Sequence, residues 1–247
     1  MTQRVLVIDA GATTIKSALS EKGELASSVH RRPTPFPCSP DVFLQVLDAT
    51  LKRHDQVDAL AVGFPGDVSA GIILDAANLS RVAGAGSPVS DELVAAWHRF
   101  DLQGEVTTRS GLPARVINDA EMALRGCCLG SGRELMVTLG TGCGVALVEE
   151  GKVQVIDDVG GASFDGIRSF DDALGERGRR IDEAQWTMDV VESLNRLVGE
   201  FRADRLHLAG GNSRRLSHLL LRQVNTPCTI ERGEPVFHGG FSLFVEF

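Results

Sequence analysis

The sequence predicts an α/β fold built from two related lobes with a cleft between them. Short β-branched segments such as Val5 to Ile8 alternate with amphipathic segments such as Asp182 to Arg202, which indicates strands flanked by helices. The segment VLVIDAGATTIKSALSEKGEL near the N-terminus also returns in pattern as LMVTLGTGCGVALVEEGKVQV from Leu135. Each copy has the order strand, small-residue turn, strand, glycine turn, strand. Two copies of one unit predict an internal duplication.

The first half contains the signals of several helices and strands. Ser39 is an expected N-cap, because a serine followed by a proline is typical of a helix start. Pro65-Gly66-Asp67 interrupts an apolar strand and predicts a turn. The further elements expected here are strands over 58–64, 71–74 and 114–117, a helix from Ser90 to about Phe100, and a helix from Asn118-Asp119 to near Gly130.

The second half is expected to repeat the sheet and to end in helices. A long helix over 182–202 precedes a strand over 205–209, and Gly210-Gly211-Asn212 then leads into a helix from Ser213 to about Gln223. The closing segment GGFSLFVEF favours neither a helix nor a strand. We expect an N-terminal lobe over 1–117 and a C-terminal lobe over 118–247, with the extreme C-terminus packing back on the first lobe.

Composition restricts the class of protein. A chain of 247 residues, 43% hydrophobic and 23% charged, predicts a globular protein with a real core. A net charge of −8 disfavours nucleic-acid binding, because phosphate backbones attract lysine and arginine. The absence of a leader-like N-terminus and of a long apolar run predicts a cytoplasmic protein without membrane contact. The five cysteines lack zinc-ligand spacing and are expected to be reduced thiols: Cys38, Cys127, Cys128, Cys143 and Cys228.

The glycine turns are candidate phosphate sites. The P-loop pattern G-x-x-x-x-G-K-[ST] does not occur in the sequence. GTGCG at 140–144 suggests a dinucleotide fingerprint, but that fingerprint needs a following helix, and the sequence continues as a strand. The remaining interpretations are two tight polar hairpins, or two hairpins whose backbone N–H groups bind phosphate where glycine leaves room. Two copies of the hairpin and the Gly210-Gly211 turn favour phosphate binding.

Four segments carry a resemblance to a known family. DAGATTIK at 9–16, VINDAEMALRG at 116–126, TLGTGCG at 138–144 and LAGGNSRR at 208–215 occur in the order expected of the actin/hexokinase-like superfamily. Within it the chain resembles the ROK family, and most of all its short bacterial glucokinases, including the polyphosphate-using type. GFPGDV at 63–68 and AANL at 76–79 resemble the sugar-side segments of that group.

The resemblance implies two RNase-H-like lobes with mixed five-stranded sheets, ATP or polyphosphate as phosphoryl donor, and transfer to a hydroxyl of glucose or a related sugar. It also implies a homodimer and a Mg²⁺ ion bound by Asp9 through water. The residues implied to contact phosphate or nucleotide are Asp9, Gly11, Thr13, Thr14 and Lys16 in the first hairpin, Gly140, Thr141, Gly142 and Gly144 in the second, and Gly210, Gly211 and Asn212 beside the adenosine.

Asp119 is the candidate general base. Its place at the junction of a strand and a helix also suits an N-cap, a role that Asn and Asp both fill, and the two roles are compatible for Asn118-Asp119. A carboxylate there can accept the proton of a sugar hydroxyl as that hydroxyl attacks phosphorus. By resemblance, Asn78, Asn118 and Asp158 are expected to bind the sugar together with Asp119.

One segment departs from the family pattern. ROK sugar kinases usually carry Glu-x-Gly-His after the second hairpin, whereas this chain has Asp158-Val159-Gly160-Gly161. The zinc-binding cysteine cluster of the family is also missing, so no structural zinc is expected. The departure leaves two alternatives to a glucokinase-like enzyme: a weakly catalytic sugar- or nucleotide-binding sensor, or a kinase of a non-sugar molecule such as pantothenate. A DNA-binding repressor is not expected, because the first phosphate motif begins at residue 9 and leaves no room for a helix-turn-helix before it.

Overall fold

The computed structural model describes residues 3–232 and 234–245, which form two compact units. The first unit contains Met1–Gly126 and Val236–Phe247, and the second contains Cys127–Pro235. Each unit has its own sheet and its own apolar core. Each is therefore described by itself below.

The first unit is built on a six-stranded mixed sheet with the order β3-β2-β1-β5-β9, in which β4 also pairs with β2. β1 and β2 form an antiparallel hairpin, whereas β5 and β9 join β1 in parallel. Parallel neighbours need crossover connections, and helices supply them here. The strands are β1 (Arg4–Ala10), β2 (Thr14–Glu21), β3 (Glu24–Leu25), β4 (His30–Pro33), β5 (Ala59–Phe64) and β9 (Ala114–Asn118).

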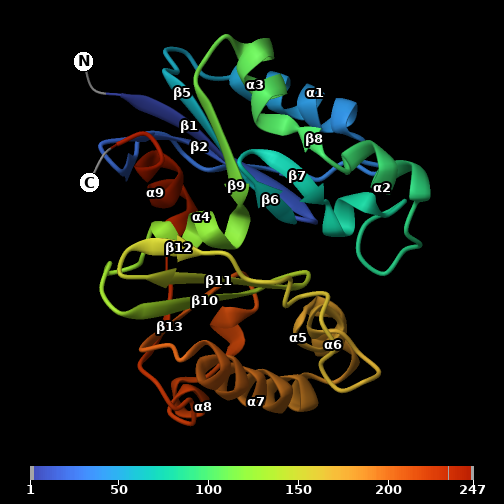
Figure 1. Cartoon of the computed structure of the whole chain (residues 1–247), viewed down its shortest axis with the longest axis vertical. Coiled ribbons are helices and arrows are strands. Elements are labelled where there is room, and N and C mark those ends of the chain that lie inside the picture. The colour runs from blue at the N-terminus through green and yellow to red at the C-terminus, as the bar shows by residue number, and fades with distance from the viewer. Residues whose placement is uncertain (1–2, 233, 246–247) are drawn as a thin grey trace. The chain divides into compact units, whose positions relative to one another are not determined.

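Helices pack on both faces of this sheet (Figure 1). Successive side chains of each strand point to opposite faces, so both faces carry apolar side chains that the helices cover. Leu6 and Ile8 belong to the same apolar cluster as Leu44 of helix α1. Val7 points to the other face, where a Cβ added at Gly240 of helix α9 would lie 2.4 Å from its Cγ1 atom. The helices of the first unit are α1 (Pro40–Leu51), α2 (Asp91–Trp97), α3 (Leu102–Ser110), α4 (Asp119–Arg125) and α9 (Pro235–Ser242).

A small second sheet lies in the first unit after β5. It has the order β6-β7-β8 and is entirely antiparallel. Gly66 starts this region, and a Cβ there would lie 2.2 Å from the backbone oxygen of Asp75, so only glycine fits the turn. Its elements are β6 (Asp67–Ser69), β7 (Ile72–Asp75), the 3-10 helix η1 (Ala77–Ser80) and β8 (Phe100–Asp101).

The second unit is built on a five-stranded sheet with the order β12-β11-β10-β13-β14. β10 and β11 form an antiparallel hairpin, and β13 and β14 join β10 in parallel. The strands are β10 (Arg133–Leu139), β11 (Cys143–Glu149), β12 (Lys152–Gln154), β13 (Arg205–Ala209) and β14 (Cys228–Ile230). This is the strand pattern of the first unit again, as the sequence repeat predicted.

Helix α7 (Glu183–Phe201) covers one face of the second sheet (Figure 1). Its buried stripe, which includes Trp186 and Leu194, shares an apolar cluster with Leu135 and Val137 of β10. The Asp182 side chain caps its first turn, and Arg202 ends it in a left-handed conformation. The other helices of the second unit are α5 (Phe170–Leu174), α6 (Glu176–Ile181), η2 (Ser213–Arg215) and α8 (His218–Leu221).

The helices differ from the expected ones in three places. The helix expected over 213–223 is broken into η2 and α8, because Ser217 caps a new helix with its side chain. The helices expected to reach Phe100 and Gly130 end at Trp97 and Arg125. Helices α3, α5 and α6 were not expected. Helix α3 has only two buried residues, α5 is only five residues long, and α6 has no buried residue, so none of them gives a long apolar pattern.

Residues 118–126 and the closing segment belong to the first unit rather than to the second. Residues 118–126, which the sequence analysis assigned to the C-terminal lobe, belong to the first unit, because β9 pairs with β5 and α4 packs beside them. Helix α9 includes the first four residues of the closing segment, 239–242. Glu246 and Phe247 lie outside the described residues.

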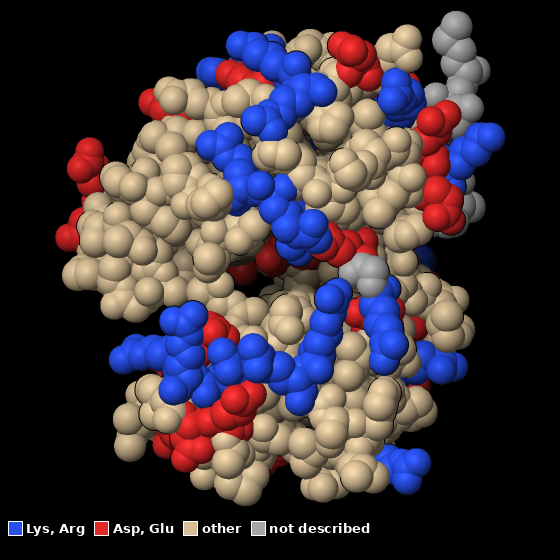
Figure 2. Space-filling view, turned by 180° about the vertical axis from the view of Figure 1, so that it is seen from behind, with Lys and Arg blue, Asp and Glu red and all other residues tan. Residues whose placement is uncertain are grey.

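Charged side chains of both signs lie next to one another on the face of the molecule shown in Figure 2. Ion pairs among the described residues include Arg133 with Glu149 at 2.8 Å and Arg177 with Asp172 at 3.1 Å. Among the described residues, no helix is both long and apolar enough to cross a bilayer.

Candidate functional site

The first hairpin places an acid and a base opposite each other. Asp9 at the end of β1 pairs in register with Lys16 of β2, and Lys16 Nζ lies 3.0 Å from Asp9 Oδ2. The side chain of Asp9 is 13% exposed, whereas that of Lys16 is 32% exposed. An acid at this position is therefore held by a strand register and a charge-assisted hydrogen bond rather than by a flexible loop.

The turn of this hairpin is fixed from two sides. The Gly11 N–H donates to the Thr14 backbone oxygen at 3.1 Å, and a Cβ at Gly11 would lie 2.9 Å from that oxygen. The Thr34 hydroxyl donates to the Gly11 backbone oxygen at 2.7 Å. Because the Gly11 N–H already has a protein acceptor, Gly11 supplies the turn geometry, and the exposed Thr13 lies at the tip.

Asn118 forms the cap that the sequence assigned to the Asn118-Asp119 pair. Its Oδ1 atom accepts the N–H groups of Ala120 at 2.9 Å and Glu121 at 3.0 Å, and its Nδ2 donates to the Gly66 backbone oxygen at 3.0 Å. The side chain of Asn118 thus joins the start of α4 to the turn after β5. Asp119 is the first residue of α4, and its Oδ1 accepts the Ala120 N–H at 2.8 Å.

The surroundings of Asp119 raise the pKa of its carboxyl group well above the ordinary value of an aspartate. Asp119 is half-buried, and burial raises its pKa to about 7. The negative charge of Asp9 contributes to this raised pKa, whereas the Ala120 N–H and the Lys16 ammonium act in the opposite direction. A carboxyl group with a pKa near neutrality suits general-base catalysis, because it can accept and release a proton at the working pH.

Gly63 is a positioning residue that the sequence analysis did not identify. It lies on β5 beside the start of α4, where a Cβ would lie 2.5 Å from Met122 Cε and 3.3 Å from Asp119 Cα. Only glycine lets α4 begin this close to the sheet. Gly63 lies within GFPGDV, but the sequence analysis placed it inside the strand expected over 58–64 and gave it no further role. Asn78 lies on η1 in the same unit and is half-buried.

The second hairpin is held by Asp171, which the sequence analysis also did not identify. Asp171 Oδ1 accepts the Cys143 N–H at 2.7 Å, and a Cβ at Gly142 would lie 2.4 Å from the same oxygen. The Gly140 N–H donates to the Gly142 backbone oxygen at 3.0 Å, and the Gly144 N–H donates to the Thr138 hydroxyl at 3.1 Å. Gly142 therefore leaves room for the Asp171 carboxylate, and the hydrogen bonds of Gly140 and Gly144 set the turn, with Thr141 at its tip.

Two further segments converge on this hairpin. The Asn212 side chain donates to the Gly140 backbone oxygen at 3.1 Å, and the Glu176 N–H donates to the same oxygen at 2.9 Å. Gly210 has a φ of 86°, and a Cβ there would lie 2.3 Å from the Leu139 backbone oxygen. The structure thus brings Asn212 and Gly210 against the second hairpin. Gly211 is exposed beside them.

Asp158 lies on the loop that follows the second hairpin. Its Oδ2 atom accepts the Gly161 N–H at 2.9 Å, which closes a short turn over Asp158-Val159-Gly160-Gly161. A Cβ at Gly160 would lie 2.7 Å from the Cys143 backbone oxygen and 2.8 Å from Asp171 Oδ1. The loop is therefore packed on the hairpin, and the exposed Asp158 stands where the family pattern has glutamate.

The candidate residues divide between the two units. Asp9, Lys16, Asn78, Asn118 and Asp119 belong to the first unit. The members in the second unit are Gly140, Thr141, Gly142, Gly144, Asp158, Gly210, Gly211 and Asn212. In each unit some candidates lie at the turn of the antiparallel hairpin, and others lie at the carboxyl end of a parallel strand, Asn118 at the end of β9 and Gly210 after β13. Open α/β sheets bind ligands at such strand ends.

Several solved structures resemble the chain along its whole length. An inorganic polyphosphate/ATP-glucomannokinase from Arthrobacter sp. strain KM has 25% sequence identity and a TM-score of 0.77, with 96% of each chain covered. A ROK family glucokinase from Streptomyces griseus, solved with glucose and AMPPNP, has 18% identity and a TM-score of 0.64, with 97% of this chain and 98% of that chain covered.

A structure from a different functional class has the same fold. A ROK family transcriptional regulator, a homologue of the E. coli MLC protein, has 14% identity and a TM-score of 0.66. The match covers 96% of this chain and 76% of the regulator. No curated protein sequence matched the chain. The shared fold is the actin/hexokinase-like one with two duplicated lobes, as the strand order of the two units requires.

The ROK family pattern matches residues 5–160, which include the first hairpin, the Asn118-Asp119 junction and the second hairpin. The match therefore covers most of the segments from which the site was built, and together with the fold it identifies the chain as a member of the ROK family.

Proposed function

We propose that the chain is a sugar kinase that transfers a phosphoryl group from ATP or polyphosphate to a hydroxyl of glucose or a related sugar. Membership of the ROK family supports phosphotransfer, and the resemblance to a polyphosphate/ATP-glucomannokinase supports both donors. The observation that carries the proposal is Asp119. It is a half-buried carboxyl group with a pKa of about 7, at the end of a parallel strand and beside the Asp9–Lys16 pair.

In the proposed reaction the acceptor hydroxyl oxygen attacks the terminal phosphorus. A bond forms between that oxygen and phosphorus, and the bond from phosphorus to the donor's bridging oxygen breaks. The hydroxyl proton passes to the Asp119 carboxylate, which later releases it to solvent. The products are the sugar phosphate and either ADP or a polyphosphate shortened by one unit.

Asp9 fits the requirements of a magnesium ligand. Its carboxylate is mostly buried and held in place by Lys16, and Mg²⁺ prefers oxygen ligands while keeping several waters. When bound through water at Asp9, Mg²⁺ would offset the negative charge of the transferred phosphate. Lys16 keeps Asp9 oriented and adds positive charge beside the first turn.

The other proposed contacts follow from the position of each segment. Thr13 and Thr14 of the first hairpin, and Thr141 with its glycines in the second, would bind the donor phosphates. Gly210, Gly211 and Asn212 would lie beside the adenosine. Asn78, Asn118 and Asp158 would bind the sugar together with Asp119, although the Asn118 side chain already caps α4 and bonds to Gly66. A homodimer and a cytoplasmic location remain predictions.

A sensor without effective catalysis is the second candidate. Asp158 Oδ2 accepts the Gly161 N–H within its own turn, and the glycine stands where the family pattern has histidine. Each unmade hydrogen bond to a buried sugar hydroxyl costs about 1–3 kcal/mol. The loss of these hydrogen bonds to the sugar favours weak hexose binding, or an acceptor other than glucose, including a non-sugar molecule such as pantothenate.

The deciding experiment measures Mg²⁺-dependent phosphate transfer from ATP and from polyphosphate to hexoses, amino sugars and pantothenate. Asp119→Asn tests the base, and Glu121→Gln is the matched control, because Glu121 lies on the same helix and pairs with Arg125 at 3.1 Å. Turnover on one acceptor that disappears only in Asp119→Asn would support the kinase. Binding of nucleotide or sugar without turnover on any acceptor would support the sensor.

A further inference from the structure

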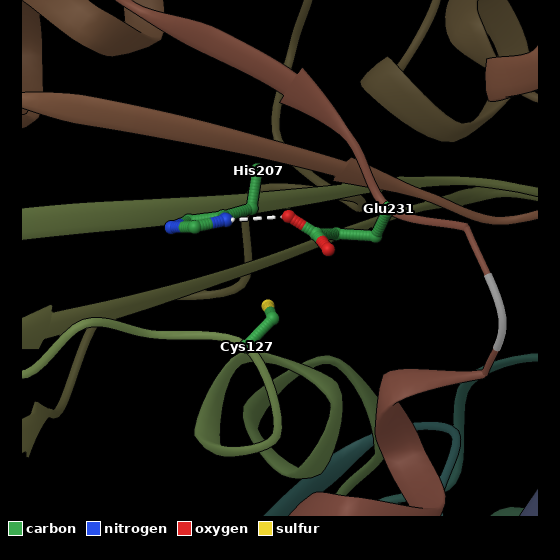
Figure 3. Close-up of side chains that lie close together, drawn as sticks. All are labelled: Cys127, His207 and Glu231. Atoms are coloured by element: carbon green, nitrogen blue, oxygen red, sulfur yellow. Dashed lines mark hydrogen bonds and ion pairs between the residues drawn. The ribbon is translucent and has the colours of Figure 1, made fainter.

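A cluster of metal-ligating side chains lies in the second unit, apart from the phosphate hairpin. Cys127, His207 and Glu231 each present one ligand atom, and these atoms all lie within 4.8 Å of one another. Figure 3 shows the thiol of Cys127 directed toward the space beside the imidazole of His207 and the carboxylate of Glu231. The three residues come from the segment after α4, from β13 and from the segment after β14.

The strand alternation of β13 explains why a histidine is buried here. Leu206 and Leu208 point to the apolar cluster under α7, so His207 between them points to the opposite face of the sheet. There it is 5% exposed. Its Nδ1 atom lies 2.7 Å from Glu231 Oε1, and its Nε2 lies 3.0 Å from Glu134 Oε2. The imidazole is therefore held between two carboxylates.

Glu134 is itself rigidly placed. Its side chain is fully buried on β10, and its carboxylate accepts the N–H groups of Leu129 at 2.9 Å and Gly130 at 2.8 Å. A buried carboxylate that accepts the second ring N–H of a histidine is the partner that metal-bound histidines almost always have, because it fixes the tautomer and the ring orientation. Here Glu134 occupies that position on Nε2, which turns Nδ1 toward Glu231 and Cys127.

We propose that Cys127, His207 and Glu231 bind a divalent cation of the zinc class, with Glu134 orienting the histidine from behind. A thiolate, an imidazole nitrogen and a carboxylate oxygen are the three ligand types of zinc sites, and the thiolate selects against magnesium and calcium. Binding replaces the bond from Nδ1 to Glu231. The thiol proton and any proton on Nδ1 pass to solvent. A water molecule would complete four-coordination.

The geometry needs a small adjustment to take the ion. Zinc bonds of about 2.0–2.3 Å in a tetrahedron place ligand atoms about 3.3–3.6 Å apart. The Nδ1 and Oε1 atoms must therefore separate from 2.7 Å, while atoms up to 4.8 Å apart must approach. Rotations of the Cys127 and Glu231 side chains supply movements of this size, whereas His207 and Glu134 stay where the strands hold them.

The location gives the site a structural consequence. Cys127 is the first residue of the second unit, and Glu231 lies four residues before Pro235, the last residue of that unit. An ion at the site would therefore fix both ends of this unit's chain to the interior strand β13. The site does not involve the family's missing cysteine cluster, from which no structural zinc was expected. It also does not depend on the proposed kinase activity.

The test titrates the chelator-treated, full-length protein with Co²⁺, a spectroscopic substitute for Zn²⁺. We expect one equivalent to give a thiolate-to-cobalt charge-transfer band and the visible bands of a tetrahedral ion, both removed by Zn²⁺. Cys127→Ala should abolish the charge-transfer band and weaken Zn²⁺ binding at least tenfold. Glu134→Gln should keep the band and weaken binding about 10–100-fold, as is typical of an orienting partner.

Cys228→Ala is the matched control, because Cys228 lies in the same sheet next to β13 and should leave the titration unchanged. Far-ultraviolet circular dichroism without metal shows whether each variant has folded, and Glu134→Gln provides a second variant should Cys127→Ala be unfolded. Absence of a charge-transfer band in the parent protein would overturn the proposal, with the cluster then acting as a Glu134–His207–Glu231 ion-pair triad. A band lost in Cys128→Ala but kept in Cys127→Ala would overturn the assignment.

Discussion

The Asp171 carboxylate accepts the backbone N–H of Cys143 at 2.7 Å and so ties helix α5 to the turn of the second glycine hairpin. The same oxygen fills the space that glycine leaves at Gly142 and Gly160. Asp171 thereby connects the turn proposed to bind phosphate with the loop that carries Asp158. Two parts of the proposed active site are held by one side chain.

Asp171→Ala is therefore expected to loosen the second hairpin. The loss of a hydrogen bond to a charged acceptor, about 1.5–3 kcal/mol, predicts a KM for the phosphoryl donor that is at least tenfold higher. Steady-state kinetics with the donor varied would measure it. Asp172→Ala is the control, because the neighbouring Asp172 forms an ion pair with the largely exposed Arg177. An equal rise of KM in both variants would contradict the specific role of Asp171.

Asp119→Asn is expected to lower kcat by about 10²–10⁴-fold, because the amide cannot accept the proton of the acceptor hydroxyl. Asparagine keeps the size of the side chain and retains an oxygen that can accept the Ala120 N–H, so the fold should be unchanged. Glu121→Gln should keep the parent kcat. Near-normal turnover in Asp119→Asn would remove this residue from the mechanism.

The rate should depend on pH through the same carboxyl group. Burial raises the pKa of Asp119 to about 7, and the base must be ionised to accept a proton. We expect kcat/KM to fall about tenfold for each pH unit below 7 and to approach a plateau above it. A pH profile measured from 5 to 9 would show this limb. A flat profile across neutrality would mean that Asp119 does not titrate there.

Stability should show the opposite dependence on pH. Between about pH 4 and pH 7 the folded protein holds a proton on Asp119 that the unfolded chain has lost, so the free energy of unfolding decreases as the pH rises through this window. Asp119→Asn removes this effect. Its melting temperature should exceed that of the parent at pH 8 by more than it does at pH 5. Equal differences at the two pH values would contradict the raised pKa.

Gly63→Ala should disturb the start of α4. The added methyl group would lie 2.5 Å from Met122 Cε and 3.3 Å from Asp119 Cα, so the predicted cost is about 1–3 kcal/mol of stability together with a several-fold lower kcat. Gly199→Ala is the contrasting control. Gly199 is an exposed helical position with no atoms within 4 Å of an added Cβ, so alanine should stabilise the protein by about 0.5–1 kcal/mol. Urea unfolding would measure both.

The sequence by itself determined the elements whose signals are local. The two hairpins, their duplication and the Ser39 cap depend on residues within a few positions of one another. The Asn118-Asp119 junction was predictable for the same reason, since capping needs one side chain and the next turn of helix. These segments also carried the resemblance that led to the ROK family.

The tertiary structure decided the features that need partners far apart in the chain. Asp171 reaches Cys143 across 28 positions, and His207 reaches Glu134 across 73. The raised pKa of Asp119 arises from burial and from Asp9, and the role of Gly63 arises from the closeness of α4. Contacts of this kind follow from the way strands and helices pack, so no local pattern of residues indicates them.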